Sequence, residues 1–124
     1  MPGTQKQLLA PAGSTGNLTG TPVAIDADIE RAAVEFVIEA IGATPQVTWK
    51  AQVSEDGITF FDAQYVTDAV DTVATAAITQ NPSVVGTKII FLRLADRAWK
   101  WVQIVVSANT NTTFRAEVYE TDVD

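Results

Sequence analysis

Acidic side chains are the groups in this sequence with the most obvious potential for chemistry. Asp26, Asp28 and Glu30 alternate along the chain, so on a strand they would share one face. Together with Asp68 and Asp71 they offer carboxylate oxygens, the ligands that Ca²⁺ prefers. The spacing lacks the central glycine and the bidentate glutamate of an EF-hand loop. We therefore interpret the group as an exposed, charged strand face and predict no metal site.

A second acidic pair, Glu35 and Glu39, has the residue types of a glycosidase. On a strand, four residues separate the two Cα atoms by about 13 Å, which exceeds the carboxylate separation of either glycosidase class. Only a helical segment would bring the pair closer. The chain has no His and no Cys, so a Ser or Thr nucleophile would lack the commonest activating base. We predict that the protein is not an enzyme and has no catalytic residues and no cofactor.

Three tryptophans could form an aromatic platform that stacks on sugar rings. Trp49 lies in an apolar alternation, and we expect it in the core. Trp99 and Trp101 share a face with Gln103, opposite the more apolar face of the same segment. For these two residues the core and an interaction surface are both open interpretations. An exposed Trp pair would be a protein interface before it is a sugar site.

The elements that must position these side chains are strands. Residues 47–53 alternate apolar and polar side chains, and Asp56-Gly57 follows as a hairpin turn signal. The return strand is expected from Ile58 to Phe61. Similar patterns predict strands at residues 23–29, 31–41, 70–79, 88–94, 99–107 and 114–119.

Residues 31–41 fit two secondary structures. Their apolar side chains match a strand face, but they also match a helical stripe closed by Gly42. The β-branched and aromatic content and the short turn at 42–46 favour a strand. About eight short strands separated by turns, at a spacing of about 8–12 residues, are typical of an all-β fold. We predict an antiparallel β-sandwich or jelly roll.

The chain divides into an extended N-terminal arm, residues 1–21, and a β-sandwich domain, residues 22–124. The arm is rich in Gly, Pro, Thr and Ser, and its apolar anchors are Leu8, Leu9 and Leu18. Such a segment cannot bury enough apolar surface to order by itself. Either it folds back on its own domain or a neighbouring subunit holds it, and we favour the second. Deletion of residues 1–20 should then leave the fold intact.

Composition excludes several partners. The net charge is −7 and the chain has no basic run, so phosphate backbones and anionic membranes should both repel it. No apolar run approaches the roughly 20 residues of a membrane-spanning helix. The N-terminus lacks the apolar core of a signal peptide. We predict a single domain that binds neither nucleic acid nor a membrane.

Two stretches resemble parts of known proteins. Residues 49–60, WKAQVSEDGITF, resemble a hairpin of small viral β-sandwich proteins and of discoidin-like modules, and residues 100–106, KWVQIVV, resemble a late strand of the same group. With the short acidic chain and the arm, the whole resembles a tailed-bacteriophage head decoration (cement) protein of the β-sandwich or jelly-roll type. That resemblance implies small oligomers that brace the junctions between major capsid protein subunits, and it implies no catalytic residues.

The first hypothesis is therefore a non-enzymatic structural protein that binds and stabilises a viral capsid lattice. It would be a homo-oligomer, made in the host cytoplasm and located on the capsid exterior of the virion. The residues expected to bind the partner are Leu8, Leu9, Leu18, Trp99 and Trp101. One alternative is a carbohydrate-binding β-sandwich module that uses Trp99 and Trp101. Another is an accessory domain of a phage tail or baseplate.

Overall fold

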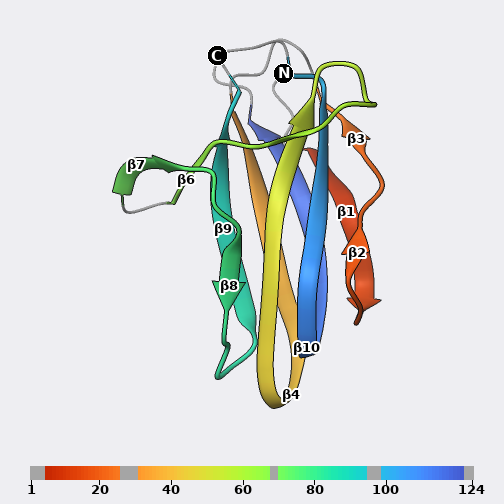
Figure 1. The fold of residues 1–124 in the computed structure, drawn as a ribbon, viewed down its shortest axis with the longest axis vertical. Helices are drawn as coiled ribbons and strands as arrows, with labels where there is room; N and C mark the ends of the chain where they lie inside the picture. The colour runs from red at the N-terminus through yellow and green to blue at the C-terminus, as the bar shows by residue number, and fades with distance from the viewer. Residues whose placement is uncertain (1–4, 26–30, 68–69, 95–98, 122–124) are drawn as a thin grey trace.

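The computed structural model describes residues 5–25, 31–67, 70–94 and 99–121. Within these ranges there is no helix, and every strand pairing is antiparallel, which confirms the predicted all-β, antiparallel fold. The described strands form one continuous sheet of ten strands, where about eight had been predicted (Figure 1). They are β1 (Gln5–Ser14), β2 (Leu18–Thr19), β3 (Val23–Ala24), β4 (Arg31–Ser54), β5 (Phe61–Asp62), β6 (Tyr65–Thr67), β7 (Val70–Ala74), β8 (Ile78–Gln80), β9 (Gly86–Arg93) and β10 (Trp101–Thr121).

Two long strands, β4 and β10, organise the sheet. They pair with one another from Trp101 opposite Ser54 to Thr121 opposite Arg31. The predicted turn at residues 42–46 was expected to join two paired strands, and this is wrong, because both parts of β4 pair with β10 instead. The two strands bend together, with positive φ angles of 48° at Thr44 and 55° at Asn111.

The bends fold the sheet over on itself. Figure 1 shows residues 46–54 of β4 in front of residues 31–41. Residues 101–110 of β10 pair with the front part of β4, and residues 112–121 pair with the rear part. Side chains from the two layers meet between them. Phe36 of the rear layer stacks on Trp49 of the front layer, with ring centroids 4.6 Å apart, and on Phe114 at 5.0 Å. This inward packing explains why residues 31–41 and 47–53 lie face to face rather than side by side.

The core confirms the predicted strand faces. Residues 31–41 form a strand, as favoured, and Trp49 is fully buried. The face of β10 that carries Val102, Ile104 and Val106 is also buried, as its apolar pattern predicted. The largest fully buried side chains are Trp49, Phe36, Phe114, Leu9, Ile90, Leu92, Ile104, Val34, Val47, Val102, Val106 and Val118.

The N-terminal segment belongs to the sheet. β1 pairs with β10 of its own chain from Gln5 opposite Glu120, and β2 and β3 extend the other part of the same edge. Leu9 is only 2% exposed and lies in the core. Residues 5–21 therefore fold back on their own domain, which differs from the favoured expectation of an arm held by a neighbour. Deletion of residues 1–20 would remove an edge strand and a core side chain.

The predicted hairpin at residues 47–61 is present with a longer loop. β5 pairs with β4, Phe61 opposite Val53, so the return strand begins at Phe61 rather than Ile58. The predicted strand at 70–79 is split into β7 and β8, and the one at 23–29 is described only as far as Ile25. β5 and β8 pair with β4 and β3 pairs with β10, whereas β7 pairs with β6 at the end of the sheet.

Candidate functional site

The loop at residues 55–60 is held by its own short side chains. Ser54 Oγ is buried, donates to Asp56 Oδ1 at 2.9 Å and accepts from the backbone N–H of Gly57 at 2.9 Å. Asp56 Oδ1 in turn accepts from the N–H groups of Thr59 and Ile58. These donors, that of Thr59 first, hold the pKa of the Asp56 carboxyl below its ordinary value. The loop is therefore preorganised by its own hydrogen bonds.

Apolar side chains gather around this loop. Ile58 is 83% exposed and Phe61 is 49% exposed. Phe61 lies against Trp99, with ring centroids 6.0 Å apart and planes tilted by 53°. Trp101 packs under Gly57, whose φ of 79° suits glycine and where an added Cβ would lie 3.1 Å from the indole. We call Ile58, Phe61, Trp99 and Trp101 the loop patch. Both Trp side chains in it are half-buried.

Polar side chains form a ladder across the outer face of the front layer. Gln103 Nε2 donates to Gln52 Oε1 at 2.8 Å, and Gln52 Nε2 donates to Asp62 Oδ1 at 3.0 Å. Lys50 Nζ lies 2.9 Å from the same Asp62 oxygen. The Gln52 donor and then Lys50 lower the pKa of Asp62. Only 8% of Gln103 is exposed, although it shares the outer face with Trp101. The hydrogen bond to Gln52 supplies the partner that a buried amide needs.

One ion-paired cluster ties β1 to the long strands of the rear layer. Arg115 lies 3.1 Å from Glu39 Oε2 and 3.3 Å from Glu117 Oε1. The other oxygen of Glu39 accepts from the N–H of Gly13 at 2.9 Å. The Gly13 donor is the largest influence that lowers the pKa of Glu39, and Arg115 lowers it further. Through these contacts the Glu39 carboxylate joins β1 to Arg115 of β10.

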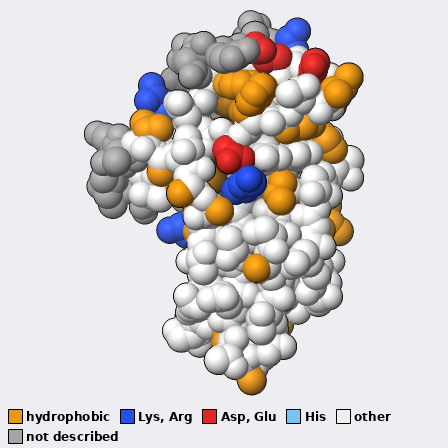
Figure 2. All heavy atoms as spheres, in the orientation of Figure 1, with side chains coloured by type: hydrophobic (Ala, Val, Ile, Leu, Met, Phe, Trp, Pro, Cys, Tyr) orange, Lys and Arg blue, Asp and Glu red, His pale blue; other side chains and the backbone are white. Residues whose placement is uncertain are grey.

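The opposite end of the molecule carries no charge. We call residues 11–21, 40–49, 78–87 and 105–114 the charge-free end, because none of them is Asp, Glu, Lys or Arg. Strand pairing brings them together at the bends of β4 and β10. Figure 2 shows the result on one face: no blue or red Lys, Arg, Asp or Glu side chain is visible in the lower part of the molecule.

Neutral hydrogen bonds close this charge-free end. Gln46 Nε2 donates to Asn81 Oδ1 at 3.0 Å, and the indole of Trp49 donates to Gln80 Oε1 at 2.8 Å. Asn109 Nδ2 donates to the Thr15 carbonyl at 2.8 Å. Amide groups therefore bridge strands here where ion pairs bridge them elsewhere. The β8–β9 loop at this end leaves two apolar side chains outside, with Val84 72% and Val85 53% exposed.

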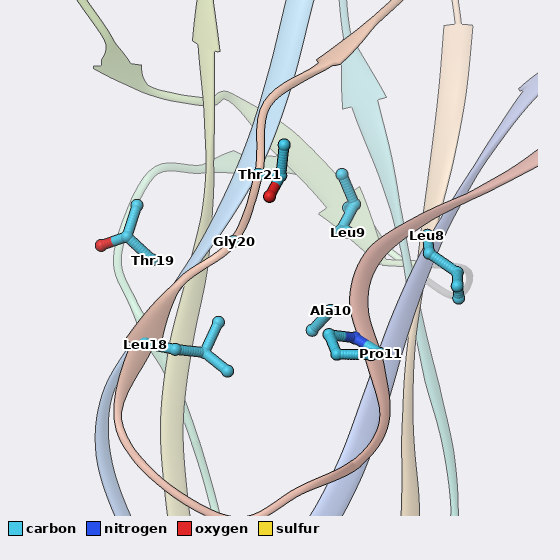
Figure 3. A pocket seen from close by; sticks show the side chains of 8 residues that line it. All are labelled: Leu8, Leu9, Ala10, Pro11, Leu18, Thr19, Gly20 and Thr21. Atoms are coloured by element: carbon cyan, nitrogen blue, oxygen red, sulfur yellow. The ribbon is translucent and has the colours of Figure 1, made fainter.

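A pocket of about 290 Å³ opens between β1 and the segment that contains β2. Three of the residues expected to bind a partner, Leu8, Leu9 and Leu18, contribute to its lining. Figure 3 shows Leu18 directed across the space toward Ala10 and Pro11, whereas Thr19 points away. The full lining is Leu8, Leu9, Ala10, Pro11, Leu18, Thr19, Gly20 and Thr21, none of which is charged.

A close backbone contact bounds the pocket. Gly20 donates its N–H to the Ile104 carbonyl at 2.8 Å, and a Cβ added at Gly20 would lie 2.0 Å from the Leu9 carbonyl oxygen. The sequence placed Leu8, Leu9 and Leu18 on one arm and Trp99 and Trp101 on a late strand. The structure brings the three leucines together at the pocket and places the two tryptophans in the separate loop patch.

The side chains of the candidate calcium ligands do not belong to the part of the chain that the structure describes. Asp26, Asp28, Glu30 and Asp68 lie outside the described residues, and so does the side chain of Asp71. Among the described residues, no group of three acidic, His or Cys side chains is placed to hold a metal ion. The described residues also include no helix with the length and apolarity needed to cross a membrane.

These features define an all-β protein built from one antiparallel sheet folded across two long strands. No family model matches the chain, and no curated protein matches it in sequence. Among solved structures, the crystal structure of the SPBc2 prophage-derived protein YomS is similar, with a TM-score of 0.66 and 10% sequence identity. The alignment covers 96% of this chain and 94% of YomS. At this identity the similarity shows a shared fold over the whole chain.

Two features of the surface were missed in the sequence. Ile58 was assigned to the return strand, which begins only at Phe61. The signal was Asp56, because an Asp side chain can accept the N–H groups of the residues that follow it and so hold a loop. The charge-free end was also missed. Its signal is visible as four separate uncharged segments, but only strand pairing shows that they meet.

Proposed function

We propose that this protein is a non-enzymatic structural subunit of a bacteriophage particle, and that it decorates and stabilises the capsid lattice. The observation that carries the proposal is the similarity in fold, over nearly the whole chain, to a prophage-derived protein. The partners would be major capsid protein subunits, and the protein would be made in the host cytoplasm and end on the capsid exterior. The folded-over sheet would be the β-sandwich that the sequence predicts.

The loop patch is the surface we propose for the particle. Ile58 is 83% exposed and Phe61, three residues later, is 49% exposed, and covering both side chains with a partner would lower the free energy of the complex. The loop beneath is preorganised by Ser54 and Asp56, so little conformational entropy is lost on binding. Many copies on one lattice would add avidity to a weak single contact.

Copy number in purified particles tests this proposal. Particles of the phage that encodes the chain are purified by density gradient, and the protein is quantified by mass spectrometry against the major capsid protein. We expect hundreds of copies per particle. A handful of copies would favour the alternative of a tail or baseplate accessory domain, and absence from particles would overturn a structural role.

A variant pair tests the surface. The double variant Ile58→Ser/Phe61→Ser should bind decoration-free particles at least tenfold more weakly, because it removes the exposed apolar side chains and leaves the core intact. Val73→Ser, at a β7 residue that is 37% exposed and lies outside both proposed surfaces, is the matched control and should bind particles as the natural protein does. Equal binding by all three proteins would exclude the loop patch as the particle-binding surface.

A carbohydrate-binding module is the second candidate, because Trp99 and Trp101 are half-buried and keep part of each indole exposed, although Trp99 also packs against the core. The 53° tilt of Phe61 against Trp99 offers no flat pair of rings at that position for a sugar to stack on. Titration with a glycan panel, followed by indole fluorescence, distinguishes the candidates. A saturable change that disappears in Trp99→Ala or Trp101→Ala would favour glycan binding, and an unchanged signal would favour the structural role.

A further inference from the structure

Two uncharged, apolar surface features lie on opposite edges of the molecule. The β8–β9 loop exposes Val84 and Val85, and it lies at the lower left of Figure 1. The pocket between β1 and β2 lies along the right-hand edge. A loop on one edge cannot reach a pocket on the other edge of the same copy. Any contact between the two features therefore joins two molecules.

Charge favours a second copy of this chain as the occupant. Each copy has a net charge of −7, so two copies that approach through their charged surfaces repel one another. The lining of the pocket and the β8–β9 loop, residues 81–85, contain no charged residue. Contact through these two surfaces requires no charged side chain of the pocket lining or of the loop to be desolvated. Glu39, which contacts β1 at Gly13, is already paired with Arg115.

We propose that copies of this chain associate head to tail, with Val84 and Val85 of one copy seated in the Leu18–Pro11 pocket of the next. A pocket of about 290 Å³ lies at the small end of the range for ligand sites of roughly 300–1,000 Å³. It suits one or two branched aliphatic side chains. The hydrogen bond from Gln46 to Asn81 anchors the loop that presents the two valines.

A head-to-tail contact uses two different surfaces, so it forms rings or chains rather than closed twofold dimers. This inference rests on the proposed function only for the expectation of a homo-oligomer, and it requires no capsid. The same geometry gives a sharp test, because a copy that has lost one surface still offers the other.

The experiment measures molar mass by sedimentation equilibrium over a range of protein concentrations, without particles. The natural chain should associate reversibly. The double variant Val84→Ser/Val85→Ser should raise the dissociation constant at least tenfold, because it removes the inserted side chains. Thr21→Glu, tested separately, should raise it by at least as much, because it places a charge at the rim of the pocket. All the substituted residues are exposed, and far-UV circular dichroism checks that the variants fold.

Thr19→Glu is the matched control for Thr21→Glu, because Thr19 is exposed and points away from the pocket (Figure 3). It should associate as the natural chain does, and so should Ile58→Ser in the loop patch. A mixture of the double valine variant with Thr21→Glu should form heterodimers and stop there, because each pair retains one intact contact.

Three outcomes would overturn the proposal. They are a natural chain that stays monomeric at all concentrations, association that both kinds of variant leave unchanged, and association that high salt abolishes, which would indicate ion pairs across the contact. The loss of particle binding in Ile58→Ser/Phe61→Ser is a separate result. Self-association and capsid binding can therefore fail independently.

Discussion

Side chains join neighbouring strands throughout this molecule, but they are ionised in one region and uncharged in another. Near β5 and along the rear layer, ionised groups join neighbouring strands, as in the pairs Lys50–Asp62 and Arg115–Glu39. At the charge-free end, amide and hydroxyl groups join strands, as in Gln46–Asn81 and the Thr48–Thr79 hydroxyl pair. In both regions these polar side chains have partners. Ion pairs and neutral hydrogen bonds therefore both suit this fold, and the fold does not require one end to be uncharged.

The charges around an exposed apolar side chain determine which kind of partner can cover it. Ile58 and Phe61 lie beside acidic side chains, where a partner must meet a mixed surface. Val84 and Val85 lie on a surface where long-range repulsion between copies is weakest. We therefore assign different partners to the two surfaces. We expect the two ends also to differ in the interactions that stabilise them.

The largest difference is expected between two tryptophans. Trp49→Ala removes the ring that stacks on Phe36 and leaves a cavity between the layers, which should cost about 3–5 kcal/mol. Trp99→Ala removes a half-buried ring at the charged end and should cost less than half of that amount. Urea unfolding followed by far-UV circular dichroism measures both. Equal losses would show that the layers are held together as strongly at the loop patch as at the central stack.

A smaller effect is expected at the close contact beside the pocket. Gly20→Ala would place a Cβ 2.0 Å from the Leu9 carbonyl oxygen, so the backbone of β1 or of the Gly20 segment must move. Overpacking of this kind costs about 1–3 kcal/mol. Gly16→Ala, whose Cβ would meet nothing within 4 Å, is the control and should lose no stability. A Gly20→Ala protein as stable as Gly16→Ala would contradict the packing described between β1 and β2.

The smallest effect is expected from pH, and only where an ionised side chain makes the contact. The pKa of Glu39 is lowered in the folded state, so its contribution to stability is present above the ordinary value of 4.5 and is lost as the pH falls through the folded value. Glu39→Gln should therefore melt below the natural chain at pH 7, and the gap should close in acid. Melting curves at pH 7 and at pH 3 measure it.

The control for this pH effect comes from the charge-free end. Gln46→Ala removes a hydrogen bond between neutral groups, so its melting temperature should differ from that of the natural chain by the same amount at both pH values. A gap for Glu39→Gln that stays constant with pH would show that the bonds to Gly13 and Arg115 do not depend on the ionised carboxylate.

The sequence predicted the local features whose signal is confined to a few residues. Alternation identified the buried faces at Val102 and Ile104, and the burial of Trp49 followed from the same pattern. Asp56-Gly57 identified a turn because the Asp side chain and the positive φ of glycine act over three or four residues. The all-β, antiparallel class followed from these patterns together.

Long-range placement was decided by the tertiary structure. The uncharged turn at 42–46 has the composition of a hairpin, but the stacking of Phe36 on Trp49 makes it a fold between layers. Leu9 resembles an anchor on a free arm, yet pairing with β10 makes it a core residue. The charge-free end consists of segments up to about a hundred residues apart in sequence, and the pocket forms only because β1 and β2 both pair with β10. Local patterns record which side chains share a face, whereas contacts between distant segments depend on packing over the whole chain.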